Sequence, residues 1–144
     1  MTVAGLLEAK GRGVITTAAH VTLAEAIDTL ARHRIGALVV VDDAGRIAGI
    51  VSERDIVRAL ARAGAGALDE QVDAVMTRKV MTCVESETIN DVMARMTRGR
   101  FRHLPVVDRD RLGGIVSIGD VVKARIEEVE READDMRAYI SAAV

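Results

Sequence analysis

Aromatic residues are almost absent from this 144-residue chain: they make up 1% of it, as Phe101 and Tyr139, and tryptophan is missing. Stacking platforms for nucleic-acid bases and aromatic cages for cations are therefore not expected. The single cysteine, Cys83, cannot form an intrachain disulfide, and the 3 histidines show no spacing typical of a zinc site. The sequence predicts no metal.

Long apolar runs and a strong excess of one charge are also missing. No stretch reaches the roughly 18 apolar residues of a membrane-spanning helix, and the N-terminus lacks the pattern of a signal peptide. We therefore expect a cytoplasmic protein that does not contact a membrane. With 20 basic and 22 acidic residues the net charge is -2, so no overall positive field is available to hold nucleic acid. A hydrophobic fraction of 49% nevertheless predicts a folded core.

One structural unit occurs twice along the chain, in residues 14–60 and 80–126. The apolar positions Leu23, Ile27 and Leu30 recur 66 residues later as Ile89, Met93 and Met96. The sequence Gly-Ile-Val-Ser at 49–52 recurs at 114–117, after an offset that is shorter by one residue. The missing residue falls between two apolar runs, where a hairpin loop tolerates a deletion. An internal repeat of this kind predicts two similar folded halves.

Within each unit the sequence predicts strand, helix, strand, strand, helix. Thr22-x-x-Glu25 and Thr88-x-x-Asp91 have the form of a capping box, and apolar residues at helical spacing follow both. Short apolar runs at 37–41 and 47–51, and at 104–107 and 112–116, are typical of buried hairpins. Extended leads at 14–16 and 80–82 precede the first helices, and second helices begin at 52 and 117.

These elements predict an α/β (α+β) fold in which two βαββα repeats are related by a pseudo-two-fold axis. A unit of about 47 residues is too small to be stable alone, so we expect the two sheets to pack against each other. The predicted divisions are residues 1–62 for the first repeat with a short N-terminal helix, 63–79 for a connection, 80–126 for the second repeat and 127–144 for a helical extension.

The motifs at 35–42 and 49–57, echoed at 101–108 and 114–122, resemble a tandem pair of CBS domains, often called a Bateman module. The resemblance covers about residues 1–126 and is to a protein that consists of a stand-alone tandem CBS pair. It implies a regulatory module that binds AMP or a related adenosyl ligand (ADP, ATP, NAD(H) or S-adenosylmethionine) between the repeats. It implies no enzymatic activity, and the protein partner that would receive the signal is unknown.

Two kinds of residue carry the predicted site. Ser117 and Asp120 lie at a helix start, where free N–H groups favour an anion, and the resemblance makes the aspartate a ribose contact. The same pair is also a capping box that can be satisfied internally. Arg102 and His103 have small residues as counterparts in the first repeat, so phosphate-binding cations are expected in one half only. The predicted ligand site comprises Arg54, Thr82, Cys83, Arg102, His103, Leu104, Pro105, Ser117 and Asp120, and a weaker second site comprises Thr16, Ser52 and Asp55.

Beyond the second repeat, apolar residues step alternately by four and three to the chain end: Val122, Ile126, Val129, Ala133, Met136, Ile140 and Ala143. This heptad pattern predicts a homodimer or a partner helix, and the alternative is a helix folded back on its own module. A second functional hypothesis is an interaction module without a nucleotide ligand, which would use the basic residues 95–103 to contact protein or nucleic acid. The net charge and the lack of aromatics favour the nucleotide sensor, and we do not expect nucleic acid as a partner.

Overall fold

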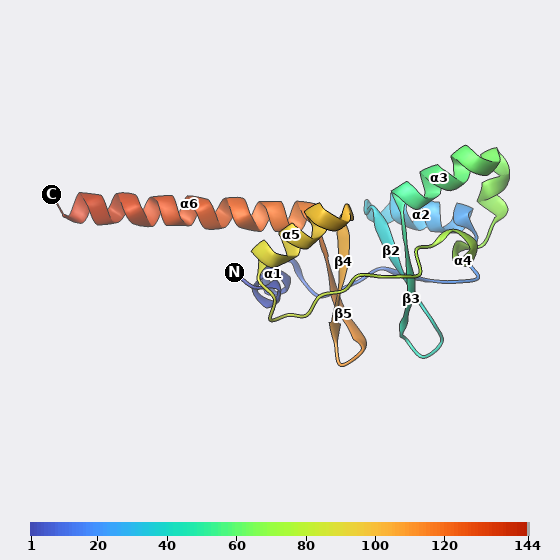
Figure 1. The fold of residues 1–144 in the computed structure, drawn as a ribbon, viewed down its shortest axis with the longest axis horizontal. Coiled ribbons are helices and arrows are strands. Elements are labelled where there is room, and N and C mark those ends of the chain that lie inside the picture. Colours follow the sequence, from blue (N-terminus) through green and yellow to red (C-terminus); the bar gives the residue numbers. More distant parts are fainter. Residues whose placement is uncertain (144) are drawn as a thin grey trace.

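The computed structural model describes residues 1–143 and shows the two predicted α/β units in sequence (Figure 1). The first unit consists of β1 (Thr16–Ala18), α2 (Leu23–His33), β2 (Ala37–Val41), β3 (Ile47–Ser52) and α3 (Glu53–Ala63). The second consists of α5 (Ile89–Gly99), β4 (His103–Asp108), β5 (Arg111–Ser117) and α6 (Ile118–Ala142). A short helix α1 (Val3–Lys10) precedes them, and the 3-10 helix η1 (Gly64–Asp69) and the helix α4 (Val72–Val75) connect them.

The strand pairing repeats between the two units. In the first sheet, β1 runs parallel to β2 and β2 runs antiparallel to β3. In the second sheet, β4 and β5 form an antiparallel pair, and Cys83 alone makes a parallel bridge to Val106 at the place of a first strand. The register shifts at Val40/Val41 and again at Val106/Val107. The predicted repeat is confirmed, although the lead strand begins at Thr16 in one copy and is reduced to one bridge in the other.

Helix caps explain where the helices begin. The Oγ atoms of Thr22, Ser52 and Ser117 each accept a hydrogen bond from the backbone N–H three residues later, and the acidic side chain there accepts one from the cap residue's N–H. These reciprocal bonds satisfy donors that a helix start would otherwise leave free. Both first helices of the repeats end at an arginine in the left-handed region, Arg34 at φ 53° and Arg100 at φ 56°.

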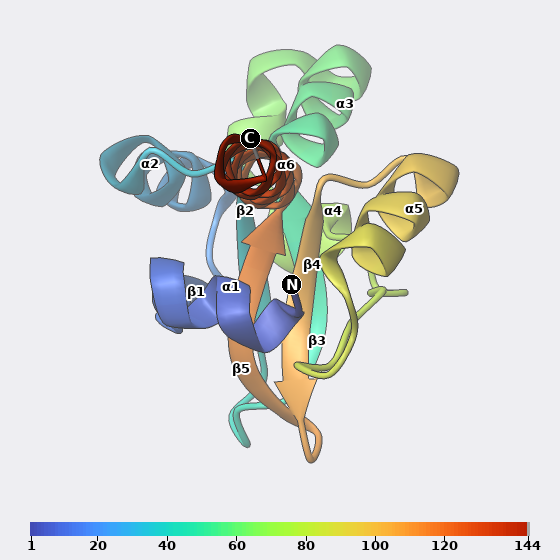
Figure 2. The same cartoon turned by 90° about the vertical axis from the view of Figure 1, so that its left-hand side faces the viewer.

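Each repeat has its own hydrophobic core, and the strands are also buried on their other face. Leu38 and Val40 of β2 belong to the core of the first repeat, whereas Val39 between them is fully buried on the opposite face. Leu104 and Val106 of β4 repeat this alternation in the second core. Figures 1 and 2 show the two hairpins next to each other, with helices on their outer sides. The repeats therefore pack through their sheets, as predicted.

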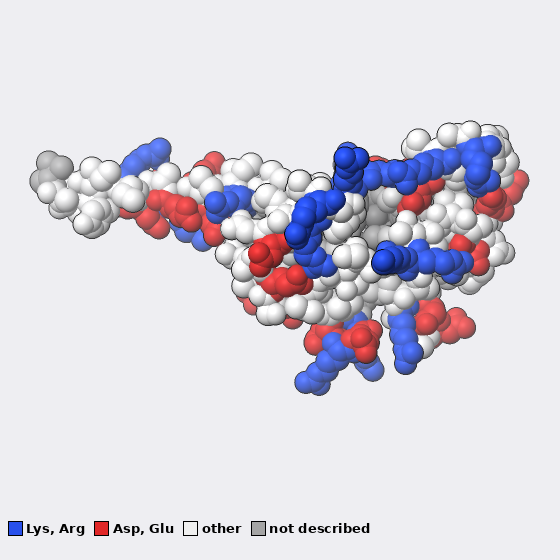
Figure 3. Space-filling view, in the orientation of Figure 1, with Lys and Arg blue, Asp and Glu red and all other residues white. Residues whose placement is uncertain are grey.

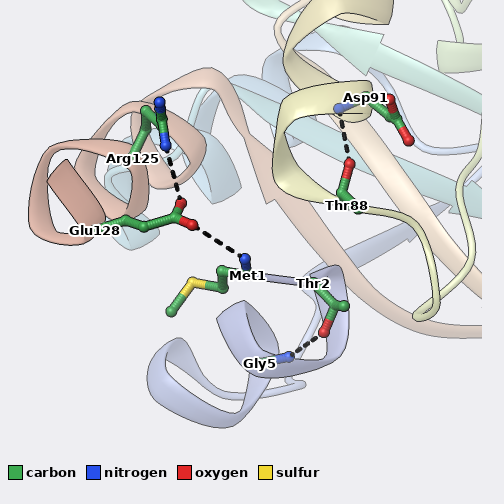
Figure 4. A network of polar contacts seen from close by, with 7 residues as sticks. All are labelled: Met1, Thr2, Gly5, Thr88, Asp91, Arg125 and Glu128. Carbon is green, nitrogen blue, oxygen red and sulfur yellow. Dashed lines mark hydrogen bonds and ion pairs between the residues drawn. The ribbon is translucent and has the colours of Figure 1, made fainter. Parts of the chain in front are cut away.

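The helix α1 packs onto the second repeat. Leu7 is fully buried in the second core, and the N–H of Val3 donates to the carbonyl of Glu87 at 2.9 Å. The terminal amino group of Met1 lies 3.3 Å from Glu128 of α6, which also pairs with Arg125 at 3.4 Å (Figure 4). These contacts fix α1 between the lead to α5 and the first turns of α6.

The helix α6 is continuous and does not fold back on its module. Val121 and Ala124 are buried in the second core, but the second half of the helix projects away from both repeats (Figure 1). Met136 and Ile140 are 59% and 56% exposed there. Among residues 1–143, no helix combines the length and the apolar character required to cross a bilayer.

Candidate functional site

A cavity of about 610 Å³ lies between the two repeats. Three segments form most of its lining: the start of α3, residues 77–81 of the connection, and the corner between α5 and β4; Gly36 and Ile50 complete it. The first repeat contributes Ser52 and Asp55, and the second contributes Arg102 and His103. The cavity is therefore composite, and a ligand inside it would contact both halves of the chain.

Asp55 lines this cavity at the start of α3. Its Oδ2 atom accepts hydrogen bonds from the backbone N–H and the hydroxyl of Ser52, at 2.9 and 3.0 Å, and its Oδ1 atom accepts one from the hydroxyl of Thr77 at 3.2 Å. An ionised carboxylate has about four acceptor positions, so one remains for a ligand. The adjacent bridge between Ile50 and Thr77 holds the connecting segment against β3 and fixes this arrangement.

Positive side chains dominate the cavity walls. The lining contains five cationic residues, Arg54, Arg58, Lys79, Arg100 and Arg102, and two acidic residues, Glu53 and Asp55. None of the five cations takes part in an ion pair among residues 1–143. Figure 3 shows lysine and arginine side chains gathered on the face where the repeats meet. Unpaired guanidinium groups around a cavity are suited to bind an anion with several oxygen atoms.

His103 and Gly36 meet across the pseudo-two-fold axis. A Cβ atom at Gly36 would lie 3.2 Å from Cε1 of His103 and 3.5 Å from a carboxylate oxygen of Glu53. Burial lowers the pKa of His103, against the opposing effect of the carboxylates of Glu53 and Asp120. The free protein therefore holds an imidazole with a reduced tendency to be protonated next to the cations of the cavity.

The equivalent aspartate of the second repeat has a different partner. Asp120 accepts from the backbone N–H of Ser117 at 2.9 Å, but the ammonium group of Lys10 lies 2.6 Å from the same Oδ2 atom. Lys10 also donates to the carbonyl of Ile115 at 2.9 Å. Burial alone would raise the pKa of Asp120, but the hydrogen bonds and charge of Lys10, together with the N–H of Ser117, outweigh it and lower the pKa.

The structure brings together some of the predicted site residues and separates others. Arg54, Arg102 and His103 share one cavity with Ser52 and Asp55, which the sequence had assigned to the weaker site. The other predicted residues lie outside this cavity. Thr82 lines a second cavity of about 460 Å³, Thr16 lies in β1, and Ser117 and Asp120 lie at the start of α6. Cys83, Leu104 and Pro105 are buried. Burial raises the pKa of Cys83 to about 12, so its thiol stays protonated. Which cleft binds a ligand stays a prediction.

Sequence reasoning missed the connecting segment as a wall of the site. Thr77, Lys79, Val80 and Met81 line the cavity, together with Arg58 and Arg100. The chain leaves α3 and returns along β3 of the same repeat, so the segment before the second repeat reaches the aspartate of the first. The sequence did offer one signal for this: Asp55 is followed by a connection that has to pass its own sheet again before it reaches the second repeat.

The basic residues 95–103 do not form one continuous free surface. Arg95 pairs with Glu87 at 2.7 Å and donates to the carbonyl of Thr82 at 2.6 Å, so its charge is used within the second repeat. Arg100 and Arg102 face the cavity instead. The remaining member, Arg98, is exposed.

Comparison with known proteins agrees with these features. Residues 11–62 and 72–127 match the family described as CBS domain. The chain is 38% identical over 109 residues to a 17.7 kDa protein of Acidianus ambivalens, covering 75% of this chain and 65% of that protein. The chain therefore spans slightly less than two thirds of this relative's length.

Two solved structures resemble the fold over most of its length. A CBS-domain-containing protein from Agrobacterium tumefaciens is 49% identical with a TM-score of 0.85, covering 87% of this chain and 99% of that one. A CBS domain protein from Pyrobaculum aerophilum, complexed with AMP, is 28% identical with a TM-score of 0.74, covering 83% and 89%. The repeated βαββα units, the composite cavity between them and these matches together show that the chain belongs to the CBS domain family, as a tandem pair of CBS domains.

Proposed function

We propose that this chain is a regulatory module that binds an adenine nucleotide in the cavity next to Asp55 and transmits the binding to a protein partner. The observation that carries the proposal is the composite cavity, which combines one aspartate at a helix start with five cations from both repeats. The AMP complex of the Pyrobaculum protein supports an adenosyl ligand for this fold. The proposal reverses the order that the sequence predicted for the two clefts.

The residues present match the parts of a nucleotide. The free acceptor position of Asp55 suits a sugar hydroxyl, since a carboxylate can only accept. Val80 and Met81 offer an apolar surface for the base, and Arg54, Arg100 and Arg102 suit phosphate oxygens. The excess of cations favours ADP or ATP over AMP, and disfavours S-adenosylmethionine because its sulfonium group is positive.

Regulation would follow from the position of the ligand between the repeats. Arg54 of α3 already donates to the carbonyl of Arg100, at 2.7 Å, so the start of one repeat is joined to the corner of the other. Phosphate groups would compete for this guanidinium and change the relative positions of the repeats. A ligand can shift such an equilibrium only through different contacts in the two states, and the two-sided cavity provides them.

Titration calorimetry on the whole chain tests this function. We expect ATP and ADP to bind with one equivalent per chain, AMP more weakly, and S-adenosylmethionine more weakly still. A single-stranded RNA of mixed sequence serves as the probe for the second hypothesis, an interaction module without a nucleotide. Binding of the RNA, and of none of the nucleotides at millimolar concentration, would contradict the proposal.

We also propose that two copies of the chain associate through the exposed apolar face of α6. The proposal rests on the seam from Val122 to Ile140, which the module itself leaves uncovered. Sedimentation of the whole chain and of a chain ending at Arg125 tests it. The full chain should reach the dimer mass as concentration rises, and the shortened chain should remain a monomer.

A further inference from the structure

The apolar stripe of α6 lies beside the module and not against it. Its members are Val122, Ile126, Val129, Ala133, Met136 and Ile140. The helix meets the second core through Val121 and Ala124. At about 100° per residue, the stripe lies about 100° from Val121 and about 160° from Ala124 around the helix. The family match ends at residue 127, so most of the stripe lies beyond the matched CBS domains.

From this stripe and the charges beside it, we infer that α6 forms a parallel, in-register coiled coil with α6 of a second copy. The inference rests on the proposed homodimer and adds its orientation. Steps of four and three residues place the stripe at the two seam positions of the heptad, where side chains of two helices interlock. In this arrangement the two modules lie at the same end of the coil.

The residues next to the seam favour the parallel orientation. Arg125 and Glu132 immediately precede seam residues, and Glu130 and Arg137 immediately follow them. In a parallel pair, Arg125 of one copy faces Glu130 of the other, and Glu132 faces Arg137. Every such pair is attractive, and each occurs twice because the dimer is symmetric.

An antiparallel coil that buries the whole stripe would bring like charges together. Val122 would then lie opposite Ile140, with residue 131 at the centre of the overlap. Glu130 would face Glu130, Glu132 would face Glu132, and Lys123 would face Arg137. Antiparallel registers shifted by one heptad would pair opposite charges, for example Lys123 with Glu130 and Arg125 with Glu132, but they leave residues at one end of the stripe, such as Met136 and Ile140, uncovered. The parallel coil is thus the arrangement that both buries the whole stripe and pairs opposite charges.

The present partners of these arginines do not prevent the rearrangement. Arg125 lies 3.4 Å from Glu128, and Arg137 lies 2.9 Å from Asp134, each within one turn of the helix. Both arginine side chains are more than one third exposed, and ion pairs on such surfaces are weak. They can therefore turn toward a second helix at little cost.

Two cysteine variants report the orientation directly. Cys83 is buried and its pKa is about 12, so it does not compete for oxidation. In the parallel coil, Ile140→Cys should form disulfide-linked dimers with itself, and so should Val122→Cys. A mixture of the two variants should give no mixed product. Mixed dimers alone would show an antiparallel coil, and no cross-linking with a monomer mass would show that the face does not pair with a second copy.

A charge exchange gives a second measurement that does not depend on oxidation. Glu130→Lys should weaken the dimer about tenfold, because two attractive pairs become repulsive. Adding Arg125→Glu should restore the original affinity. Glu127→Lys makes the same change of charge on the outer side of the helix and should leave the dimer unchanged. Equal effects of Glu130→Lys and Glu127→Lys would contradict the orientation, whatever the outcome of nucleotide titration.

Discussion

The ammonium group of Lys10 lies 2.6 Å from Asp120, whereas the equivalent aspartate, Asp55, has the neutral hydroxyl of Thr77, at 3.2 Å, as its donor from outside the capping box. The two carboxylates are otherwise alike, since each closes a capping box at the start of a helix. One of them is thus neutralised by a cation of its own chain, and the other faces the large cavity. This difference breaks the pseudo-symmetry of the two clefts.

The ion pair between Lys10 and Asp120 should stabilise the folded protein. Lys10→Met should lower the free energy of unfolding by about 1 kcal/mol at pH 7, because the pair is only partly exposed. The pKa of Asp120 is lowered in the folded state, so this contribution is present above the unfolded value of 3.8 and is lost as pH falls through the folded value. Urea unfolding at pH 7 and pH 3 measures it. Lys79→Met, with no ion pair in the described part of the chain, is the control.

Arginines that line the cavity should contribute more to ATP affinity than arginines on the nearby surface. Arg102→Ala and Arg100→Ala should each reduce ATP affinity about tenfold or more, since each removes charge-assisted hydrogen bonds to phosphate. Arg98→Ala removes the same charge from an exposed position outside the cavity and should change the affinity little. Calorimetric titration with ATP at two salt concentrations would measure the affinity of each variant. Equal losses in all three variants would mean that only the general field matters.

Binding of a phosphorylated ligand should become tighter as pH falls. In the free protein the pKa of His103 lies below 6.5, and a phosphate nearby would raise it. The complex then holds more protons than the free protein between these two pKa values, so affinity increases as pH falls through that window. Phosphate titrates in the same range, so His103→Gln supplies the baseline. A pH dependence that is identical in both proteins would remove His103 from the phosphate site.

Arg34 offers a separate test of whether the left-handed backbone conformation at the end of α2 costs stability. It ends α2 in the left-handed region at φ 53°, is exposed, and has its side chain outside the cavity. Arg34→Gly should raise the free energy of unfolding by about 1 kcal/mol, because glycine adopts this conformation without strain. Arg34→Ala keeps the Cβ atom and should give no comparable gain. Thermal unfolding of the two variants distinguishes relief of strain from loss of the arginine side chain.

The repeat and the cap residues made most of the fold predictable. Ser52 and Ser117 each mark a helix start through local spacing, and the matched apolar positions in both copies predict two similar sheets. The contacts of Asp55 and Asp120 were not predictable in the same way. They depend on Thr77 and Lys10, whose positions follow from the tertiary path of the connection and of α1. Periodicity contains no information about such a path.

Calorimetric titration of ATP into Asp55→Ala and Asp120→Ala tests the account most directly. Each substitution removes an equivalent capping box, and Asp120→Ala also removes the ion pair with Lys10, so a larger loss of ATP affinity in Asp55→Ala would not reflect a larger loss of stability. We predict that Asp55→Ala reduces ATP affinity about tenfold or more, and that Asp120→Ala leaves it nearly unchanged. The reverse order, with both variants folded, would contradict the assignment of the ligand to the cleft at Asp55.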